Sequence, residues 1–207
     1  MIGRAVLLIV AICSMFAISS SAGGEASTKL RLTDFCLGSA CLQKSGISKK
    51  SVQAEFGIGR LFVRSGDDSN ERSICYADPT GMQSAEITFT DPNKPLVRYP
   101  LAGITVTTQK ICAGNSTAPK KSLPHQIGNV RLGMAEEDLV KVLGKPVRID
   151  DAVAREKRDP RYAGTRYSAV FGEKVYVYNG DDELGFVFVF ISVSTRTVST
   201  VWAAISE

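Results

Sequence analysis

Residues 131–146 read RLGMAEEDLVKVLGKP, and residues 44–59 repeat the phrase loosely as KSGISKKSVQAEFGIG. Gly46 and Gly57 of the earlier phrase coincide with Gly133 and Gly144 of the later one. The apolar positions also coincide: Met134, Leu139 and Leu143 stand where the earlier copy has Ile47, Val52 and Phe56. A self-similar stretch of this kind predicts one small structural unit that is used twice.

The later copy carries the signals of a short helix. Its first turn contains Glu136, Glu137 and Asp138, which the positive end of the helix dipole stabilises. An apolar stripe with helical spacing follows: Leu139, Val142 and Leu143. Gly144 can end the helix in a left-handed conformation, and Pro146 prevents its continuation.

The earlier copy predicts a similar helix with a narrower apolar stripe. Ser48 is a suitable N-cap, and Gly57 stands where the helix should end. Weak signals for one further short helix precede each copy, at residues 33–42 and 124–129. Each unit is therefore expected to contain a helix-loop-helix.

Alternating apolar and polar residues after each helix predict antiparallel strands. The expected strands are 72–76, 84–90 and 103–108 in the first unit, and 166–171, 174–178, 184–191 and 197–205 in the second. In the first unit, Ala85 and Ile87 face one way and Glu86 and Thr88 the other, which predicts one solvent-exposed face. The expected fold class is α+β, with two tandem units of a helix-loop-helix and an antiparallel three- to four-stranded sheet.

The strands of the second unit are apolar on both faces. One face must pack on the helix, so the other must meet the first unit, a partner or solvent. Because Tyr and Trp often carry the binding energy of interfaces, we predict a partner-binding surface made of five aromatic residues. They are Tyr176, Tyr178, Phe186, Phe188 and Trp202. The alternative is that these side chains belong to the core.

The N-terminus has the features of a signal peptide in residues 1–22. A basic residue precedes an apolar stretch at residues 5–18, and small residues allow cleavage near Ala22. The stretch is short for a membrane span, and an uncleaved anchor is the alternative. Cys13 resembles a lipid-attachment cysteine, but Ile12 stands where that motif needs a small residue. We expect a periplasmic or secreted protein with no integral membrane span after cleavage.

Four cysteines remain after the signal peptide: Cys36, Cys41, Cys75 and Cys112. An even number in an exported chain predicts two disulfides. Four cysteines allow three pairings, and the short spacing of Cys36 and Cys41 favours a local bridge, which leaves Cys75 to pair with Cys112. Zinc is the alternative, but the spacings lack the two close pairs typical of structural zinc sites.

Composition and single residues give little support for catalysis or nucleic-acid binding. The net charge of +4 is too small to indicate a nucleic-acid partner. His125 is the only histidine, so a Ser-His or Cys-His pair would have to use it. Asp150 and Asp151, and the acids at 181–183, stand in predicted turns and lack the glycine spacing of a calcium loop. We expect no enzymatic activity, no cofactor and no metal.

Composition also divides the chain into successive segments. These are a signal peptide (1–22), a flexible N-terminus (23–29), a first α+β repeat (30–113), a linker rich in small residues and proline (114–124) and a second α+β repeat (125–207). Each repeat is long enough for only a small core.

The phrase at residues 132–134, with Leu139, Val140 and residues 143–146, resembles the helix signature of a bacterial envelope superfamily. This is the β-lactamase inhibitor protein-like superfamily, which includes the small outer-membrane assembly lipoproteins. The resemblance implies a helix-loop-helix on an antiparallel sheet, in tandem as in the inhibitor proteins. It also implies protein binding through an aromatic sheet face, where Tyr176, Tyr178 and Phe188 would lie.

The sequence thus predicts an exported, non-enzymatic protein-binding module that uses a β-sheet face. Inhibitor, immunity and envelope-assembly proteins all fit this description, and the partner is expected to be a protein in the periplasm or outside the cell. Two alternatives stay open at this point. One is a structural envelope scaffold with no exposed binding face, and the other is a small periplasmic hydrolase that depends on His125.

Overall fold

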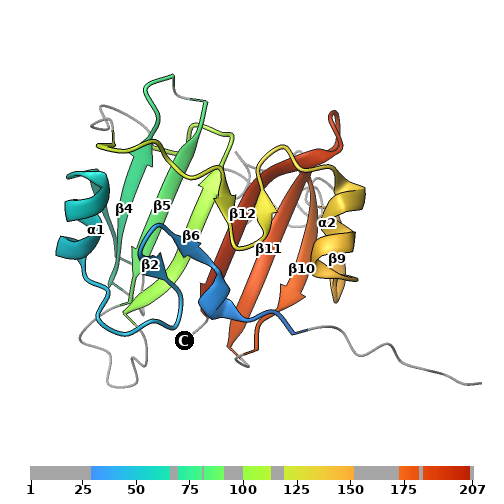
Figure 1. The fold of residues 1–207 in the computed structure, drawn as a ribbon, viewed down its shortest axis with the longest axis horizontal. Coiled ribbons are helices and arrows are strands. Elements are labelled where there is room, and N and C mark those ends of the chain that lie inside the picture. The colour runs from blue at the N-terminus through green and yellow to red at the C-terminus, as the bar shows by residue number, and fades with distance from the viewer. Residues whose placement is uncertain are drawn as a thin grey trace, which may run out of the picture.

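A computed structural model describes residues 29–65, 70–80, 82–90, 100–112, 119–151, 173–181 and 184–205. Eight antiparallel strands form one continuous sheet in the order β3-β4-β5-β6-β12-β11-β10-β9 (Figure 1). In chain order the strands are β3 (Arg60–Ser65), β4 (Asn70–Ala77), β5 (Ser84–Phe89), β6 (Leu101–Thr107), β9 (Arg148–Asp151), β10 (Glu173–Asn179), β11 (Gly185–Ser192) and β12 (Thr197–Ile205). The first half of the chain supplies β3 to β6, and the second half supplies β9 to β12.

The remaining elements lie on one face of this sheet, which we call the helical face (Figure 1). They are the 3-10 turn η1 (Leu32–Asp34), the hairpin of β1 (Cys36–Leu37) and β2 (Ala40–Cys41), helix α1 (Lys49–Phe56), the hairpin of β7 (Gln126–Ile127) and β8 (Val130–Arg131), and helix α2 (Glu136–Leu143). Their apolar side chains and one face of the strands form a single core. Each half therefore runs in the order hairpin, helix, four strands.

The predicted α+β fold class is wrong, because the described residues form mostly β-strands with two short helices. The predicted architecture differs from the structure in two respects. The segments expected to form the first helix of each unit form short β-hairpins instead, with Gly38 (φ 58) and Gly128 (φ 57) in their turns. These left-handed conformations suit glycine and interrupt a helix. The two small sheets are also one sheet, because β6 pairs with β12 along Gly103 to Thr107. This pairing satisfies two strand edges that separate units would leave open.

The two predicted helices are confirmed, together with their ends. The Ser48 side chain accepts a hydrogen bond from the N–H of Ser51, and the Ser51 hydroxyl accepts one from the N–H of Ser48, which is a reciprocal cap. Gly57 (φ 96) ends α1 and Gly144 (φ 78) ends α2. The glycine stop is therefore confirmed at both helices and the serine cap at α1, whereas Val142 of the predicted apolar stripe is 44% exposed.

The strand predictions are correct for the inner strands and incomplete at the edges. The edge strands β3 and β9 were not predicted, and the strand expected at 166–171 lies outside the described residues. The face of the first half that was predicted to be solvent-exposed is instead buried at Ser73, Ser84 and Glu86, each exposed by 2% or less. The hydroxyls of Thr107 and Thr200 share a hydrogen bond of 2.7 Å on the same face.

The first residues of the described chain bind to the second half. The N–H of Leu30 donates to the carbonyl of Asn179, and the carbonyl of Leu30 accepts from the N–H of Asp181. The Asp181 carboxylate also accepts from the N–H of Leu32 at 3.1 Å. A side chain on Gly180 would meet Leu32 at 2.8 Å, so a glycine is required for this close approach. The two halves are thus joined at this turn as well as by β6 and β12.

Candidate binding face

The five aromatic residues predicted to form one surface lie on both faces of the sheet. Tyr178 pairs with Val187, whereas Phe188 pairs with Val177. Because side chains alternate along a strand, the tyrosines and the phenylalanines point to opposite sides. Tyr176 and Tyr178 are 4% and 1% exposed on the helical face and belong to the core, so the prediction that they are surface residues is wrong.

The other three residues lie on the face opposite the helices, which we call the far face. Phe186, Phe188 and Trp202 are each partly exposed there. The rings of Phe188 and Trp202 stack with centroids 4.8 Å apart and an interplanar angle of 22°, and Phe186 lies 6.1 Å from Phe188. We call these three side chains the aromatic patch. Phe188 and Trp202 pack against three buried residues of the same face: Val175, Val177 and Phe190.

Small residues beside the patch determine how its rings lie. Thr105 pairs with Trp202 on the neighbouring strand, and Gly103 pairs with Ala204. A Cβ atom on Gly103 would stand 3.2 Å from the indole Nε1 of Trp202, which is tighter than an ordinary contact. The absence of a side chain at Gly103 therefore leaves the space in which the indole lies across β6.

A charged cluster at the start of α2 was missed by sequence reasoning. The Glu136 carboxylate, 9% exposed, accepts hydrogen bonds of 2.5 Å from the Lys174 ammonium and the Tyr176 hydroxyl. Its second oxygen accepts from Nε and Nη2 of Arg196, both at 3.2 Å. The hydrogen bonds from Lys174, Tyr176 and Arg196 outweigh burial and lower the pKa of Glu136 to about 2. The carboxylate thus fixes α2 to β10 and to the turn after β11.

The cluster has a simple structural role, because every oxygen of the carboxylate is already occupied. The N–H of Glu136 donates to the carbonyl of Arg196, so backbone and side chain join the same two segments. In the sequence the only signal was an acid in the first turn of a helix. Its partners are 38, 40 and 60 residues further along the chain, where no local pattern points to them.

One buried tyrosine in each half supports the glycine that ends the helix. The hydroxyl of Tyr76 donates to the carbonyl of Gly57 at 2.9 Å, and the hydroxyl of Tyr178 donates to the carbonyl of Gly144 at 3.5 Å. Burial raises the pKa of Tyr76 to about 12 and also raises the pKa of Tyr178. Both hydroxyls therefore remain protonated donors at neutral pH.

Both disulfides are present, in the pairing that the sequence favours. Cys36–Cys41 joins directly opposite residues of the β1–β2 hairpin and is partly exposed. Cys75–Cys112 joins β4 to the segment after β6, and its cysteines are 1% and 0% exposed. Two disulfides are typical of exported proteins, which agrees with the expectation of export.

The remaining predicted site residues take ordinary structural positions. His125 is exposed just before β7, and its carbonyl accepts the N–H of Leu132. Asp150 pairs with Arg148 on the edge strand β9 at 2.9 Å, and the side chain of Asp151 lies outside the described residues. Asp181 receives the N-terminal segment, as described above. Among the described residues no cluster of acids, histidines and cysteines could hold a metal ion.

Comparisons with known proteins identify no family. No family model matches the chain, and no curated protein matches it. Three solved structures have a limited likeness. A cysteine-rich secretory protein from Staphylococcus aureus is 12% identical, with a TM-score of 0.40 over 77% of this chain and 44% of its own. A DUF4309 family protein from Bacillus subtilis is 18% identical, with a TM-score of 0.38 over 79% and 85%.

The third is an extracellular protein containing a SCP domain from Bacillus anthracis. It is 10% identical, with a TM-score of 0.41 over 90% of this chain and 49% of its own. The chain therefore spans less than half of the first and third structures. Within the described residues, no helix is both long and apolar enough to cross a membrane.

Proposed function

We propose that the chain is an exported, non-enzymatic protein-binding module whose partner contacts the aromatic patch. The observation that carries this proposal is the partial exposure of Phe186, Phe188 and Trp202 side by side on the far face. Adjacent aromatic side chains that stay partly exposed to water favour a surface that a partner covers. Such residues also contribute most of the binding energy in many protein interfaces.

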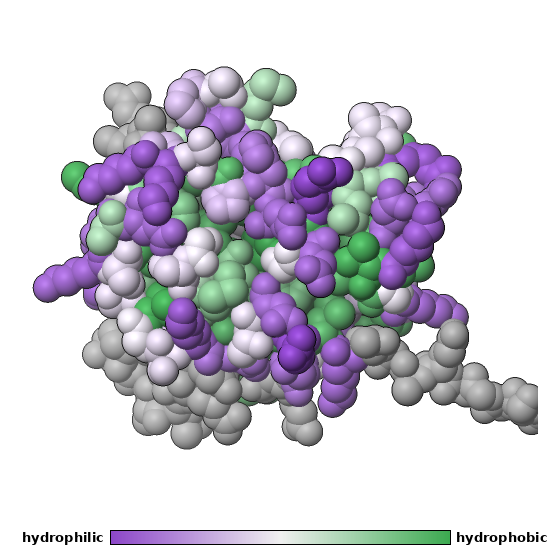
Figure 2. All heavy atoms as spheres, viewed as in Figure 1, coloured by the Kyte–Doolittle hydropathy of each residue, from purple (hydrophilic) through white to green (hydrophobic). Residues whose placement is uncertain are grey.

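The composition of the two faces supports the far face as the binding side. On the helical face, polar and charged side chains are spread over the surface between smaller apolar areas (Figure 2). The helices and hairpins already cover the apolar side chains of the strands there. On the far face, the patch is carried by the central strands β11 and β12, which both pair on two sides and hold the rings in place. A rigid aromatic surface loses little entropy on binding.

Inhibitor, immunity and envelope-assembly proteins are the classes that we propose, in the periplasm or outside the cell after cleavage near Ala22. The resemblance of the helix phrase to an envelope superfamily implied a helix-loop-helix and a face with Tyr176 and Tyr178, which the hairpins and the burial of both tyrosines contradict, so the proposal depends on the aromatic patch. A structural scaffold is the competing function, and it requires that no partner covers the patch.

The test uses the single tryptophan of the chain as a probe. The mature chain is immobilised, exported proteins of its source are captured, and each captured protein is purified and titrated into the free chain. Burial of Trp202 by the partner should shift its emission to shorter wavelength. A complex that forms with unchanged Trp202 emission contradicts the proposed binding face, and the absence of any partner supports the scaffold function.

A matched pair of variants locates the partner on one face. Phe188→Ser removes the ring at the centre of the patch and should weaken binding at least tenfold. Val142→Ser makes a comparable apolar-to-polar change at a residue of α2 that is 44% exposed on the opposite side, and should leave the affinity unchanged. Far-ultraviolet circular dichroism verifies that both variants are folded.

A further inference from the structure

We propose that Cys36–Cys41 is a thiol–disulfide exchange site, which an external dithiol opens while the fold and the Cys75–Cys112 bond stay intact. The two disulfides of this chain differ first in access. Cys36 and Cys41 are partly exposed on the β1–β2 hairpin, whereas Cys75 and Cys112 are 1% and 0% exposed. Exchange begins when a thiolate reaches a disulfide sulfur, so access determines which bond reacts.

The second half of the chain indicates that the hairpin does not require this bond. The β7–β8 hairpin has the same two-residue strands and the same two-residue turn, with Gln126 opposite Arg131 where the first hairpin has Cys36 opposite Cys41. It carries no disulfide, yet its inward residues Ile127 and Val130 are fully buried. A hairpin of this form is therefore held by its core contacts.

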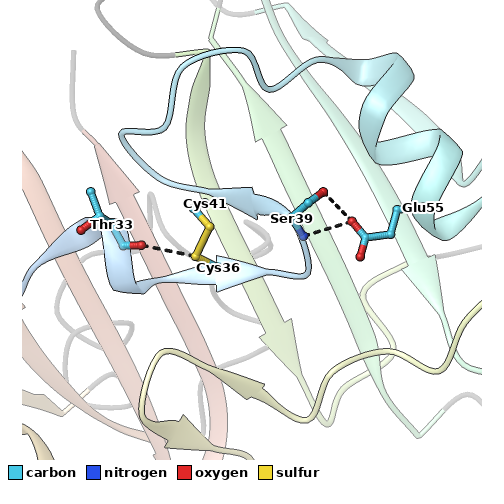
Figure 3. Close-up of a disulfide and its surroundings, with 5 residues drawn as sticks. All are labelled: Thr33, Cys36, Ser39, Cys41 and Glu55. Atoms are coloured by element: carbon cyan, nitrogen blue, oxygen red, sulfur yellow. Dashed lines mark hydrogen bonds between the residues drawn. A yellow bond between two sulfur atoms is a disulfide. The ribbon is translucent and has the colours of Figure 1, made fainter.

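Contacts other than the disulfide also hold the β1–β2 hairpin in place. Its inward residues Leu37 and Ala40 are 0% and 1% exposed in the common core. Its turn is bound to α1, because the N–H and the hydroxyl of Ser39 donate to the Glu55 carboxylate at 3.0 and 2.5 Å (Figure 3). These contacts do not involve sulfur and remain when the bond is opened.

The reduced hairpin also has an acceptor for one of its thiols. The Sγ atom of Cys36 lies 3.3 Å from the carbonyl oxygen of Thr33 (Figure 3). In the disulfide this sulfur carries no proton, but a Cys36 thiol could donate to that oxygen without moving. The thiol would then be a weak hydrogen-bond donor in a position that the fold already provides.

The exchange is a balanced two-electron reaction. One thiolate of the dithiol attacks a sulfur of Cys36–Cys41, the S–S bond breaks, and the other cysteine leaves as a thiolate that takes up a proton. The second thiol of the reductant, after losing its proton, attacks the mixed disulfide and releases the first cysteine. The protein gains two electrons and two protons, and the dithiol becomes a disulfide.

The test applies graded dithiothreitol to the folded full chain, followed by iodoacetamide and mass spectrometry of the labelled peptides. We expect Cys36 and Cys41 to be labelled at a dithiothreitol concentration at least tenfold below that needed for Cys75 and Cys112. Trp202 emission should stay unchanged over that range. Labelling of both pairs together, or labelling that follows the loss of native emission, would overturn the proposal.

A second variant tests the premise drawn from the β7–β8 hairpin. The double substitution Cys36→Gln with Cys41→Arg gives the first hairpin the residues that the second one uses. The variant should fold with native Trp202 emission and show no labelling at low dithiothreitol. If it does not fold, the hairpin depends on its disulfide and the proposal fails.

Discussion

The two halves of the chain build the same elements with different stabilising contacts. In the first half, Ser48 and Ser51 cap α1 reciprocally, and two disulfides join its segments. In the second half, α2 begins after Ala135 without a side-chain cap, and the Glu136 carboxylate joins it to β10 and to the turn after β11 instead. The second half contains no cysteine.

The comparison distinguishes the features that the fold needs in both halves from the stabilising contacts that differ between them. Both halves keep a glycine in the hairpin turn, a glycine at the helix end and a buried tyrosine beneath it. Among the described residues, the disulfides and the capping box stabilise the first half and the Glu136 cluster stabilises the second, so these are alternative ways to stabilise one backbone arrangement. Removing a contact from one half, or transferring it to the other, should therefore change stability without changing the backbone arrangement.

The largest effect is expected from the buried disulfide. Cys75→Ser with Cys112→Ser should lower the free energy of unfolding by about 4 kcal/mol, because the bond closes a long loop. Its sequence separation is 37, against 5 for Cys36–Cys41, whose removal should cost about 2 kcal/mol. Urea unfolding followed by Trp202 fluorescence measures both losses. Equal losses would contradict the distinction between a structural and an exchangeable bond.

The second prediction concerns the pH dependence that Glu136 gives to the second half. Its pKa is lowered from 4.5 to about 2 in the folded state. The carboxylate therefore stabilises the fold fully above pH 4.5, and this contribution of about 3 kcal/mol is lost as the pH falls from 4.5 to 2. Glu136→Gln should be about 2 kcal/mol less stable at pH 7 and should lose stability less steeply in that window.

The control for Glu136 is the neighbouring acid Glu137, which is exposed in the same helical turn. Glu137→Gln keeps the position near the helix start but touches none of the cluster partners. It should change stability by less than about 0.5 kcal/mol at pH 7. Equal acid sensitivity of the wild type and Glu136→Gln would show that other carboxylates determine the acid limit.

The two helices and the inner strands were predictable from the sequence, whereas the hairpins, the edge strands and the long-range arrangement were not. Gly57 and Gly144 identify helix ends because the constraint acts within one turn of the chain. The hairpins at 36–41 and 126–131 were mistaken for helices because strands of two residues are too short to display an alternating pattern. The joining of the two sheets depends on contacts of β6 with β12, which are far apart in the sequence.

Three of the five residues predicted for the binding face lie on it, and the two tyrosines do not. Tyr178 and Phe188 lie on adjacent antiparallel strands, so their faces follow from the register and not from their type. The turn signal at Asn179 and Gly180 did not supply this register, because Asn179 is itself a strand residue that pairs with Phe186, which places Tyr178 opposite Val187. Grouping residues by aromatic character alone therefore combined two buried tyrosines of one face with the partly exposed aromatic patch of the other.

The third prediction transfers a bond from the first half to the second. Gln126→Cys with Arg131→Cys places two cysteines directly opposite each other on β7 and β8, in the register of Cys36 and Cys41. A disulfide should form under oxidising conditions and raise the free energy of unfolding by up to about 2 kcal/mol. Reduction should remove this gain and leave the native Trp202 emission. Failure of the bond to form would indicate that the two hairpins are not equivalent.

The smallest effect should come from the tyrosine beneath each helix end. Tyr76→Phe removes a buried hydrogen bond of 2.9 Å to the carbonyl of Gly57 and should cost about 1 to 1.5 kcal/mol. Tyr178→Phe removes a longer contact of 3.5 Å to Gly144, so its cost should be below about 1 kcal/mol. Both changes keep the ring and its packing, so the stability that each variant loses relative to the wild type measures the contribution of its hydroxyl alone. If Tyr178→Phe is the more damaging, the C-terminal end of α2 depends on its tyrosine more than the longer distance from Tyr178 to Gly144 indicates.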